Sequence, residues 1–224
     1  PNPAVWHRLA INAFLFADYS VPLLYNKSTR KNMKQNRENP FFETYRTPFG
    51  TPPFDQIETE QYEPAFDEGI RQLDEEVRAI ADNTELPTFE NTIIALERSG
   101  KLLDKVISAF FNVLNAEADD EMMDISQRVS PKLSESSNNI YLNEQLFARV
   151  KSVYDRKDEL HLPMEDARLL EKTFEAFCAR GAALGPEEKE KYRKLSSELS
   201  LLSLIFDQNA LKDKNRYELL LTKE

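Results

Sequence analysis

Glycine, cysteine and histidine are all scarce in this sequence. Its 224 residues include five Gly, one Cys and two His. Five Gly is about 2% of the chain, against an average of about 7%, which disfavours tight hairpins and glycine-rich phosphate loops. A single Cys excludes an intrachain disulfide framework and a cysteine-rich zinc module. Two His, at positions 7 and 161, are too few for a three-histidine metal site.

Long apolar runs are absent too. No stretch of about 18 uncharged apolar residues occurs, so the sequence predicts no membrane-spanning helix. Hydrophobic residues make up 41% of the chain and charged residues 30%, which is typical of a folded globular protein. A chain of this length forms one or two domains and buries roughly 70% of its unfolded surface.

Charge is distributed unevenly along the chain. Residues 1–38 contain six basic and two acidic residues, giving +4, and the remainder holds 23 basic and 37 acidic residues, giving −14. These values agree with the overall charge of −10. An acidic body repels nucleic acid and anionic membranes, so we expect neither as a partner.

The N-terminal stretch differs from the rest. Residues 9–25 are aromatic and apolar, but Asp18 and Pro22 interrupt them and no small-residue cleavage site is evident, which makes a poor signal peptide. Met33, followed by Lys-Gln-Asn, reads as a translation start. We therefore expect residues 1–38 to be an extension that is non-native or disordered, with the native start at Met33.

Prolines divide the remainder into an irregular segment and a helical body. Eight of the twelve prolines lie within residues 1–64. Residues 39–53 combine Pro with Phe and Tyr, a composition that excludes a helix or a central strand. We expect this Pro/Phe-rich segment to be extended and pinned to the helical body by its aromatic rings.

The first two helices follow from apolar spacing. From Pro64 to about Asn83 one apolar stripe recurs at intervals of three and four residues, which predicts a helix. Thr88 is a suitable N-cap for a second helix, whose stripe continues to Leu114. Gly100 interrupts this second helix, and we expect another helix to approach closely there.

Four further helices are predicted downstream. The third starts at the acidic run 119–121 and is kinked or broken at Pro131. Asn143 caps the fourth, and Pro163 opens the fifth. Pro186 opens the sixth, which runs to about residue 212 and carries a stripe of Tyr192, Leu195, Leu199, Leu202 and Phe206.

The predicted fold is therefore all-α. It is a multi-helix bundle of about six long helices preceded by the irregular Pro/Phe-rich segment. We expect residues 39–216 to form one helical domain and residues 217–224 to begin a further segment.

Few residues suggest chemistry of their own. His161 and Glu165 are four apart, but Pro163 lies between them, so we interpret His161 as a loop histidine. The acidic runs 74–76 and 119–121 lack the alternating carboxylates of a calcium loop and are read as solvated helix faces and helix starts. Cys178 has no histidine partner and is expected to be a small core residue. We assign no catalytic, cofactor-binding or metal-ligating residue.

Two patterns could instead mediate binding. The basic cluster 27–37 could contact phosphate, but it is short and joined to an acidic body, so we interpret it as a solvated tail. The leucine stripe of the sixth helix could form a dimerising coiled coil. It covers only two or three heptads, so we expect it to be an internal face of the bundle.

Several short motifs resemble one enzyme family. They are Asn39-Pro40-Phe41, Pro48-Phe49-Gly50-Thr51-Pro52-Pro53-Phe54-Asp55, Tyr62-Glu63-Pro64-Ala65-Phe66, Pro87-Thr88-Phe89-Glu90-Asn91-Thr92-Ile93, Ala95-Leu96-Glu97-Arg98-Ser99-Gly100 and Asn138-Asn139-Ile140-Tyr141-Leu142-Asn143. In this order they resemble the N-terminal part of the peptidyl-dipeptidase Dcp branch of the thimet oligopeptidase and oligopeptidase A family of zinc metallopeptidases.

The resemblance implies a two-lobed helical enzyme with a deep channel, in which these helices form one wall. The family's zinc activates a water that attacks a peptide carbonyl, and the Dcp branch releases C-terminal dipeptides from short peptides. The zinc motif of the family lies beyond residue 224, so no catalytic residue carries over and no cofactor is expected in this chain. The implied partners are the catalytic lobe and short peptide substrates, in a cytoplasmic monomer.

Two functions therefore compete. A channel-wall domain, inactive alone, predicts an exposed apolar face where the rest of the enzyme packs. A free-standing helical module that binds a peptide or protein predicts a stable monomer or dimer with cooperative unfolding. A nucleic-acid module built on residues 27–37 is the weakest alternative.

Overall fold

The structure is a computed structural model that describes residues 39–117 and 119–216. The predicted extension 1–38, the start at Met33, the basic cluster 27–37 and the segment 217–224 lie outside the described residues. The domain boundaries placed there remain predictions.

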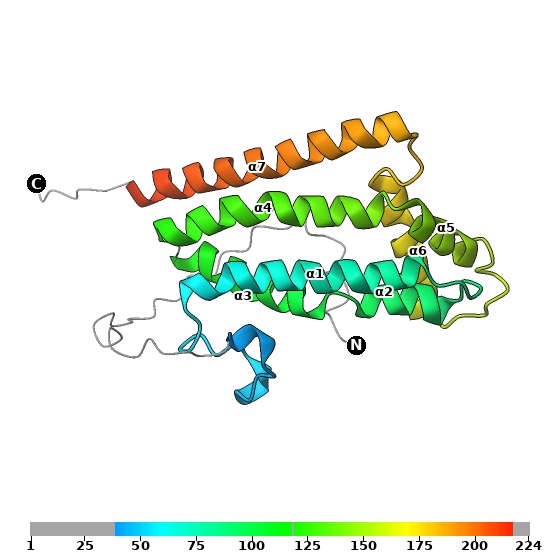
Figure 1. The fold of residues 1–224 in the computed structure, drawn as a ribbon, viewed down its shortest axis with the longest axis horizontal. Helices are drawn as coiled ribbons and strands as arrows, with labels where there is room; N and C mark the ends of the chain where they lie inside the picture. The colour runs from blue at the N-terminus through cyan, green and yellow to red at the C-terminus, as the bar shows by residue number, and fades with distance from the viewer. Residues whose placement is uncertain (1–38, 118, 217–224) are drawn as a thin grey trace, which may run out of the picture.

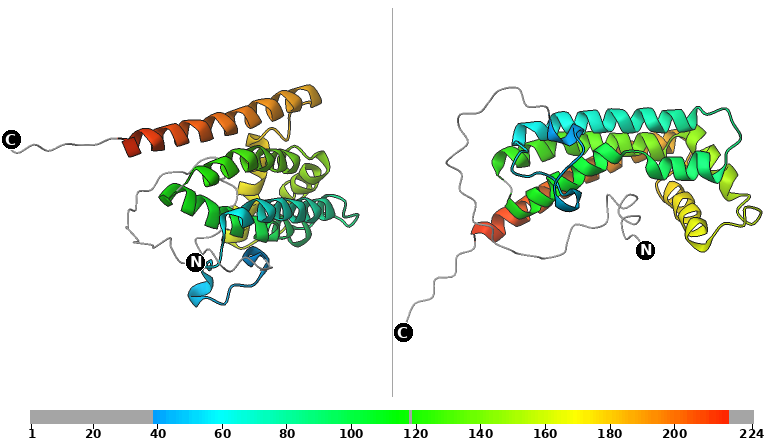
Figure 2. Two further views of the ribbon diagram at one scale, coloured as in Figure 1. Left: turned by 60° about the vertical axis from the view of Figure 1, so that its left-hand side comes forward. Right: turned by 90° about the horizontal axis from the view of Figure 1, so that it is seen from below.

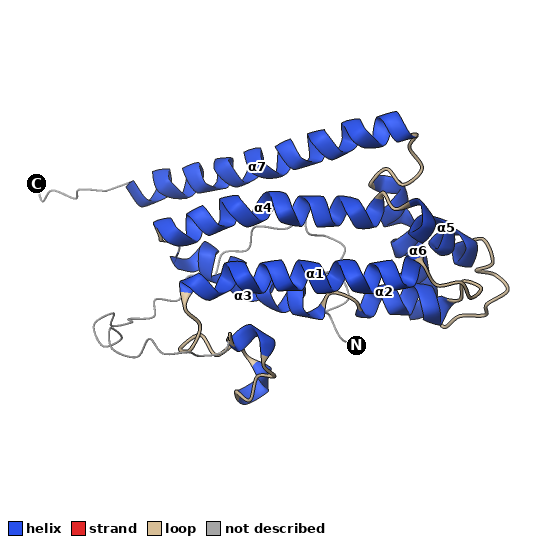
Figure 3. Ribbon diagram, viewed as in Figure 1, coloured by secondary structure: helices blue, strands red, loops and turns tan. Residues whose placement is uncertain are grey.

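Helices dominate the described part of the chain, and no strand occurs within it (Figure 3). In chain order the elements are α1 (Tyr62–Ala81), the π-helical turn η6 (Phe89–Ile94), α2 (Ala95–Arg98), α3 (Lys101–Glu117), α4 (Asp120–Tyr141), α5 (Glu144–Tyr154), α6 (Met164–Ala179) and α7 (Pro186–Arg216). The predicted all-α class is confirmed, and six of the helices are 11 to 31 residues long.

Three predicted helix starts are confirmed by their caps. The Thr88 hydroxyl accepts a hydrogen bond from the Asn91 amide at 3.1 Å, and the Asn91 side chain accepts one from the Thr88 amide, so the pair forms a capping box. Asp119 accepts from the amide of Met122 and Asn143 from that of Leu146, each at 2.9 Å. Local sequence therefore fixes where η6, α4 and α5 begin.

The prediction of one helix running through Gly100 is wrong, because the chain turns there. Gly100 has φ of 72°, a left-handed conformation that favours glycine, and it separates α2 from α3. Its amide donates to the Glu76 carboxylate at 2.6 Å. A Cβ at this position would lie 3.1 Å from Leu73 Cδ1, so the expected close approach of another helix, α1, is confirmed.

A break at Pro131 does not occur, because α4 is one helix from Asp120 to Tyr141. Proline leaves the carbonyl of residue 127 without its helical donor. Both Pro131 and Gln127 are exposed, so water can satisfy that carbonyl. The helix therefore tolerates the proline on its solvent side.

Two apolar cores hold the bundle together. One joins α1, α3 and α4 to the Pro/Phe-rich segment, and the other joins the end of α1 to η6, α5 and α6. Phe66 and Phe110 meet edge to face in the first core, with ring centroids 5.2 Å apart. Figures 1 and 2 show α1, α3 and α4 side by side, with α5 and α6 gathered at one end.

The Pro/Phe-rich segment is pinned to the body as predicted. Phe41 is 1% exposed, and its ring centroid lies 5.3 Å from that of Tyr62. Lys105 of α3 donates to the carbonyls of Phe41 at 2.8 Å and Glu43 at 2.6 Å, and its Nζ lies 3.7 Å from the centroid of the Tyr45 ring. Within it, short 3₁₀ turns at Pro40–Phe42 and Pro48–Gly50 replace part of the predicted extended path, and a third turn, Thr59–Gln61, precedes α1.

Helices α1 and α3 touch where glycine permits it. A Cβ on Gly69 would lie 3.0 Å from the Cα and 3.1 Å from the amide nitrogen of Leu103, both backbone atoms. A larger residue at position 69 would therefore push the two helices apart.

We predict that Gly69→Ala lowers the free energy of unfolding by about 1–3 kcal/mol, because overpacking outweighs the gain in helix propensity. Urea denaturation measures this change. In Ala79→Gly, at an exposed position of α1, only propensity changes, and we expect a loss of about 1 kcal/mol. A more stable Gly69→Ala variant would contradict the close contact.

Candidate functional site: an outward apolar face on the last helix

The acidic and histidine residues considered above do not assemble into a site. His161 is exposed in a loop, as predicted, with its Nδ1 2.8 Å from the Glu159 carbonyl oxygen. Asp119 and Asp120 stand at the start of α4, where their charge suits the helix dipole. Within residues 39–117 and 119–216, no group of three or more His, Cys, Asp or Glu is placed to hold a metal ion.

Cys178 is exposed, so its predicted place in the core is wrong. The preceding residue, Phe177, is fully buried and stacks near Phe147 with ring centroids 6.0 Å apart. Successive residues point about 100° apart around a helix, so burying Phe177 turns Cys178 toward solvent.

Perturbed pKa values in the bundle follow from burial and ion pairs. A hydrogen bond from Arg128 holds the pKa of Glu63 below its usual value, and burial raises the pKa of Asp74. Burial also lowers the pKa of Lys105 and raises that of Tyr45 to about 12. Each of these groups lies at a contact between elements; Asp74, for example, accepts a hydrogen bond from the Ser136 hydroxyl of α4 at 3.1 Å.

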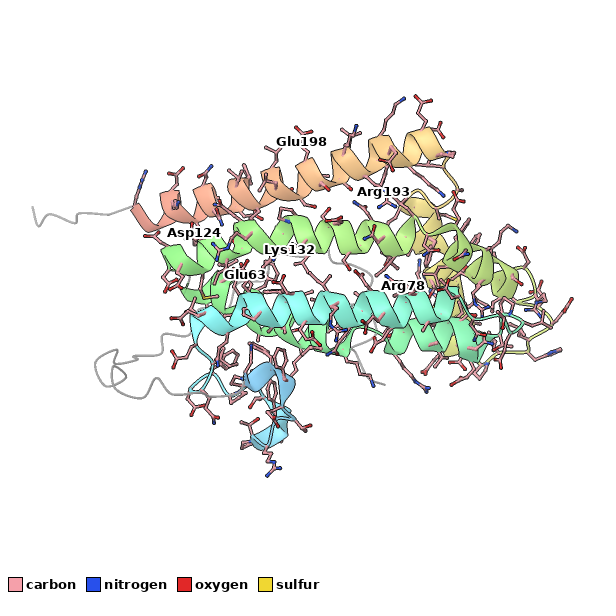
Figure 4. All side chains as sticks on the ribbon, viewed as in Figure 1. Glu63, Arg78, Asp124, Lys132, Arg193 and Glu198 are labelled. Carbon is pink, nitrogen blue, oxygen red and sulfur yellow. The ribbon has the colours of Figure 1, made fainter. Side chains whose placement is uncertain are left out.

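The side of α7 that faces α4 is polar. Figure 4 shows Arg193 on this side, where its guanidinium donates to Asn139 Oδ1 at 3.0 Å. Asn138 donates to the Ser196 hydroxyl at 2.8 Å, and Lys189 donates to Glu144 at 2.9 Å. Serines and long polar side chains therefore occupy positions that leucine usually takes in a bundle. We call this polar contact of α7 with the bundle the polar seam.

Gln208 is the most enclosed of the residues that α7 contributes to this polar seam. It is 7% exposed, and its Oε1 accepts from Gln127 Nε2 at 2.8 Å. Its own Nε2 donates to the Ser126 hydroxyl at 2.9 Å and to the Met123 carbonyl at 3.3 Å. The amide thus has partners at both ends, which offsets the cost of burying it.

The opposite side of α7 carries an exposed apolar stripe beside charged residues such as Glu198 (Figure 4). Its stripe consists of four side chains that are each more than half exposed: Leu195 at 66%, Leu199 at 64%, Leu202 at 55% and Phe206 at 71%. Leu201 and Ile205 flank it at 36% and 38%. We call the four residues of the stripe the α7 face.

The prediction that this stripe lies inside the bundle is therefore wrong for Leu195, Leu199, Leu202 and Phe206, whereas Tyr192, the fifth predicted member, is half-buried. The stripe has the predicted helical period, but α7 turns another side to α4, the side on which Figure 4 shows Arg193. Contiguous exposed apolar surface marks an interaction site in a folded protein. A sequence signal for this arrangement exists in Ser196, Ser200 and Gln208, which repeat at helical spacing opposite the leucines.

The described helices give no candidate for a membrane span, because none combines sufficient length with sufficient apolarity.

Comparison with known proteins gives the family. Dipeptidyl carboxypeptidase of Escherichia coli strain K12 is 43% identical over 173 residues, which are 77% of this chain and 25% of that protein. The enzyme of the same name from Salmonella typhimurium is 39% identical over equal shares of the two chains. The chain is homologous to these peptidases. Oligopeptidase A of E. coli is more distant, at 23% identity over 74% of this chain and 24% of its own length.

No family model matches the chain. The chain spans about a quarter of the length of the curated relatives it matches. The resemblance read from the sequence motifs is thus confirmed over the helical region, whereas the activity of a whole enzyme is a separate question.

We predict that Gln208→Ala lowers the free energy of unfolding by about 1–3 kcal/mol, because it removes the hydrogen bonds of the Gln208 amide to Gln127, Ser126 and Met123 of α4. Denaturant titration followed by circular dichroism measures this. The neighbouring Asn209 is exposed, so Asn209→Ala should change stability by less than about 0.5 kcal/mol. Equal effects of the two variants would contradict the polar seam.

Proposed function

We propose that this chain is the helical channel-wall domain of a zinc metallopeptidase that releases C-terminal dipeptides from short oligopeptides. In this proposal the α7 face packs against the remainder of the enzyme. The protein is a cytoplasmic monomer, its substrates are short peptides, and neither nucleic acid nor membrane is a partner.

Homology supports the class of enzyme, and the α7 face supports the role of this domain in it. At 43% identity, this chain and the E. coli dipeptidyl carboxypeptidase share a common fold in the matched region. Four large apolar side chains in one stripe remain more than half exposed, although polar residues of the same helix are buried. Covering that stripe would remove apolar surface from water, at roughly 25 cal/mol for each Å² buried.

The zinc of such an enzyme does not fit the described residues, since no suitable donor group occurs among them. We therefore derive no catalytic step from this chain. In this proposal the domain contributes a rigid wall of the channel, which limits the substrates to peptides able to enter that channel.

A free-standing binding module is the second candidate, and the same apolar face favours it. In that case the occupant is a separate peptide or protein. The two candidates differ in whether the face is covered within one enzyme or by a partner in solution.

A chimera distinguishes them. Residues 39–216 of this chain replace the matched stretch of E. coli dipeptidyl carboxypeptidase, and dipeptide release from a synthetic oligopeptide is measured with and without zinc. We expect zinc-dependent release by the chimera and none by the 224-residue chain alone. A folded but inactive chimera, or an active isolated chain, would overturn the proposal.

Substitution in the α7 face tests the proposed packing. We predict that Leu199→Asp lowers the activity of the chimera at least about tenfold, because a charge in an apolar contact is costly. Leu86 is also an exposed leucine, at 80%, but belongs to the loop between α1 and η6, so Leu86→Asp should leave the activity unchanged. Similar losses in both variants would indicate a general folding defect.

A further inference from the structure

Phe49 has a backbone conformation that no contact within the described chain explains. Its backbone has φ of 61° and ψ of 13°, in the left-handed region that bulky residues rarely adopt. Its side chain is 103% exposed, so no contact within the described chain compensates for this conformation. An observed backbone outlier of this kind points to a functional constraint.

The loop that presents Phe49 is closed and rigid. The Thr47 hydroxyl donates to the carbonyl of Thr51, and the Thr51 hydroxyl donates to that of Pro48 at 3.1 Å. The Gly50 amide also donates to the Thr47 carbonyl, at 3.0 Å. Prolines at 48, 52 and 53 restrict the chain further.

The base of this loop is tied to the bundle. Asn39 Nδ2 donates to the Gln61 carbonyl at 2.8 Å, and Phe41 is buried beside Tyr62. Lys105 holds two carbonyls of the same segment, those of Phe41 and Glu43. Phe49 is thus displayed at a fixed place on the body, which lowers the entropic cost of binding a fixed surface.

The loop that carries Phe49 is uncharged and partly apolar, although charged residues such as Glu43, Glu68 and Lys101 line the groove beside it. Residues 47–54 carry no charged side chain, although the chain has a net charge of −10. Phe42 and Phe54 are each about half exposed, at 51% and 49%. An open groove of about 1080 Å³ adjoins the loop, and Phe42, Tyr45 and Pro52 are among its lining residues.

We propose that Phe49 inserts into an apolar pocket on the remainder of the peptidase, as a second docking contact separate from the α7 face. This inference rests on the proposed function. Two observations identify the remainder of the peptidase as the surface that receives Phe49. The matched relatives extend over about four times the region shared with this chain. A rigidly held aromatic ring also suits one constant pocket better than it suits peptides of varied sequence.

The two contacts lie far apart on the bundle. Figures 1 and 2 show the Pro/Phe-rich segment, drawn in blue, on the opposite side of α1 from α7. A partner that covers both must reach across the layer formed by α1 and α4. Docking at both places would fix the orientation of the wall, whereas the α7 face alone leaves it free to tilt about one helix.

Phe49→Asn tests this inference through opposite effects on two proteins. Asn tolerates the left-handed conformation and removes the ring. In the isolated 224-residue chain we expect the thermal unfolding midpoint to rise by a few degrees, because strain is relieved. In the chimera we expect the half-life of dipeptide-releasing activity at a fixed elevated temperature to fall by about threefold or more, because a docking contact is lost.

Leu86→Ser is the matched control, since it also removes an exposed apolar side chain and should change neither quantity. An active chimera whose half-life is unaffected by Phe49→Asn overturns this inference and leaves the proposed function intact. A wild-type chimera without activity overturns both. A raised KM for the peptide at an unchanged half-life would show that Phe49 contacts the substrate. Loss of a dimer of the isolated chain would show that Phe49 contacts a second copy. Either result overturns the proposal that Phe49 binds a pocket on the remainder of the peptidase.

Discussion

The contact of α1 with α3 at Gly69 is the constraint from which the arrangement of the bundle follows. Backbone atoms of Leu103 lie where a Cβ on residue 69 would be, so the two helices approach as closely as glycine permits. α1 also contacts α4, α5 and the segments on either side of it. Its position therefore sets the layer on which α7 rests and the surface to which the Pro/Phe-rich segment is tied.

Large apolar side chains of α1 to α6 are mostly buried in two cores, with Met164 as an exception, whereas α7 leaves several of its own exposed. The first six helices place their large side chains in two cores, and several of these, including Phe66, Phe110 and Phe177, are fully buried. α7 is held to α4 by hydrogen bonds of Gln208, Ser196 and Arg193 instead. Such a polar seam fixes register while leaving the leucines available, which is the arrangement that a domain of a larger enzyme requires.

Features set by neighbouring residues could be predicted from the sequence. The caps at Thr88, Asp119 and Asn143 depend on side chains within three positions of the amides they bind, and helical periods report which residues favour burial. The turn at Gly100 could not be predicted in the same way, because it depends on Leu73 and Glu76, which are more than 20 positions away. The helical spacing of apolar residues also identified the stripe of α7, but this spacing does not indicate which surface covers the stripe.

The role proposed for this domain requires that the α7 face be an interface within a peptidase. Cysteine accessibility measures this directly: Leu199→Cys is introduced after replacing the exposed Cys178 with Ser, and thiol labelling is timed in the isolated chain and in the chimera. We predict fast labelling in the isolated chain and labelling slower by at least about tenfold in the chimera, since a buried thiol reacts only when its contact opens. Equal rates in the two proteins would contradict the claim.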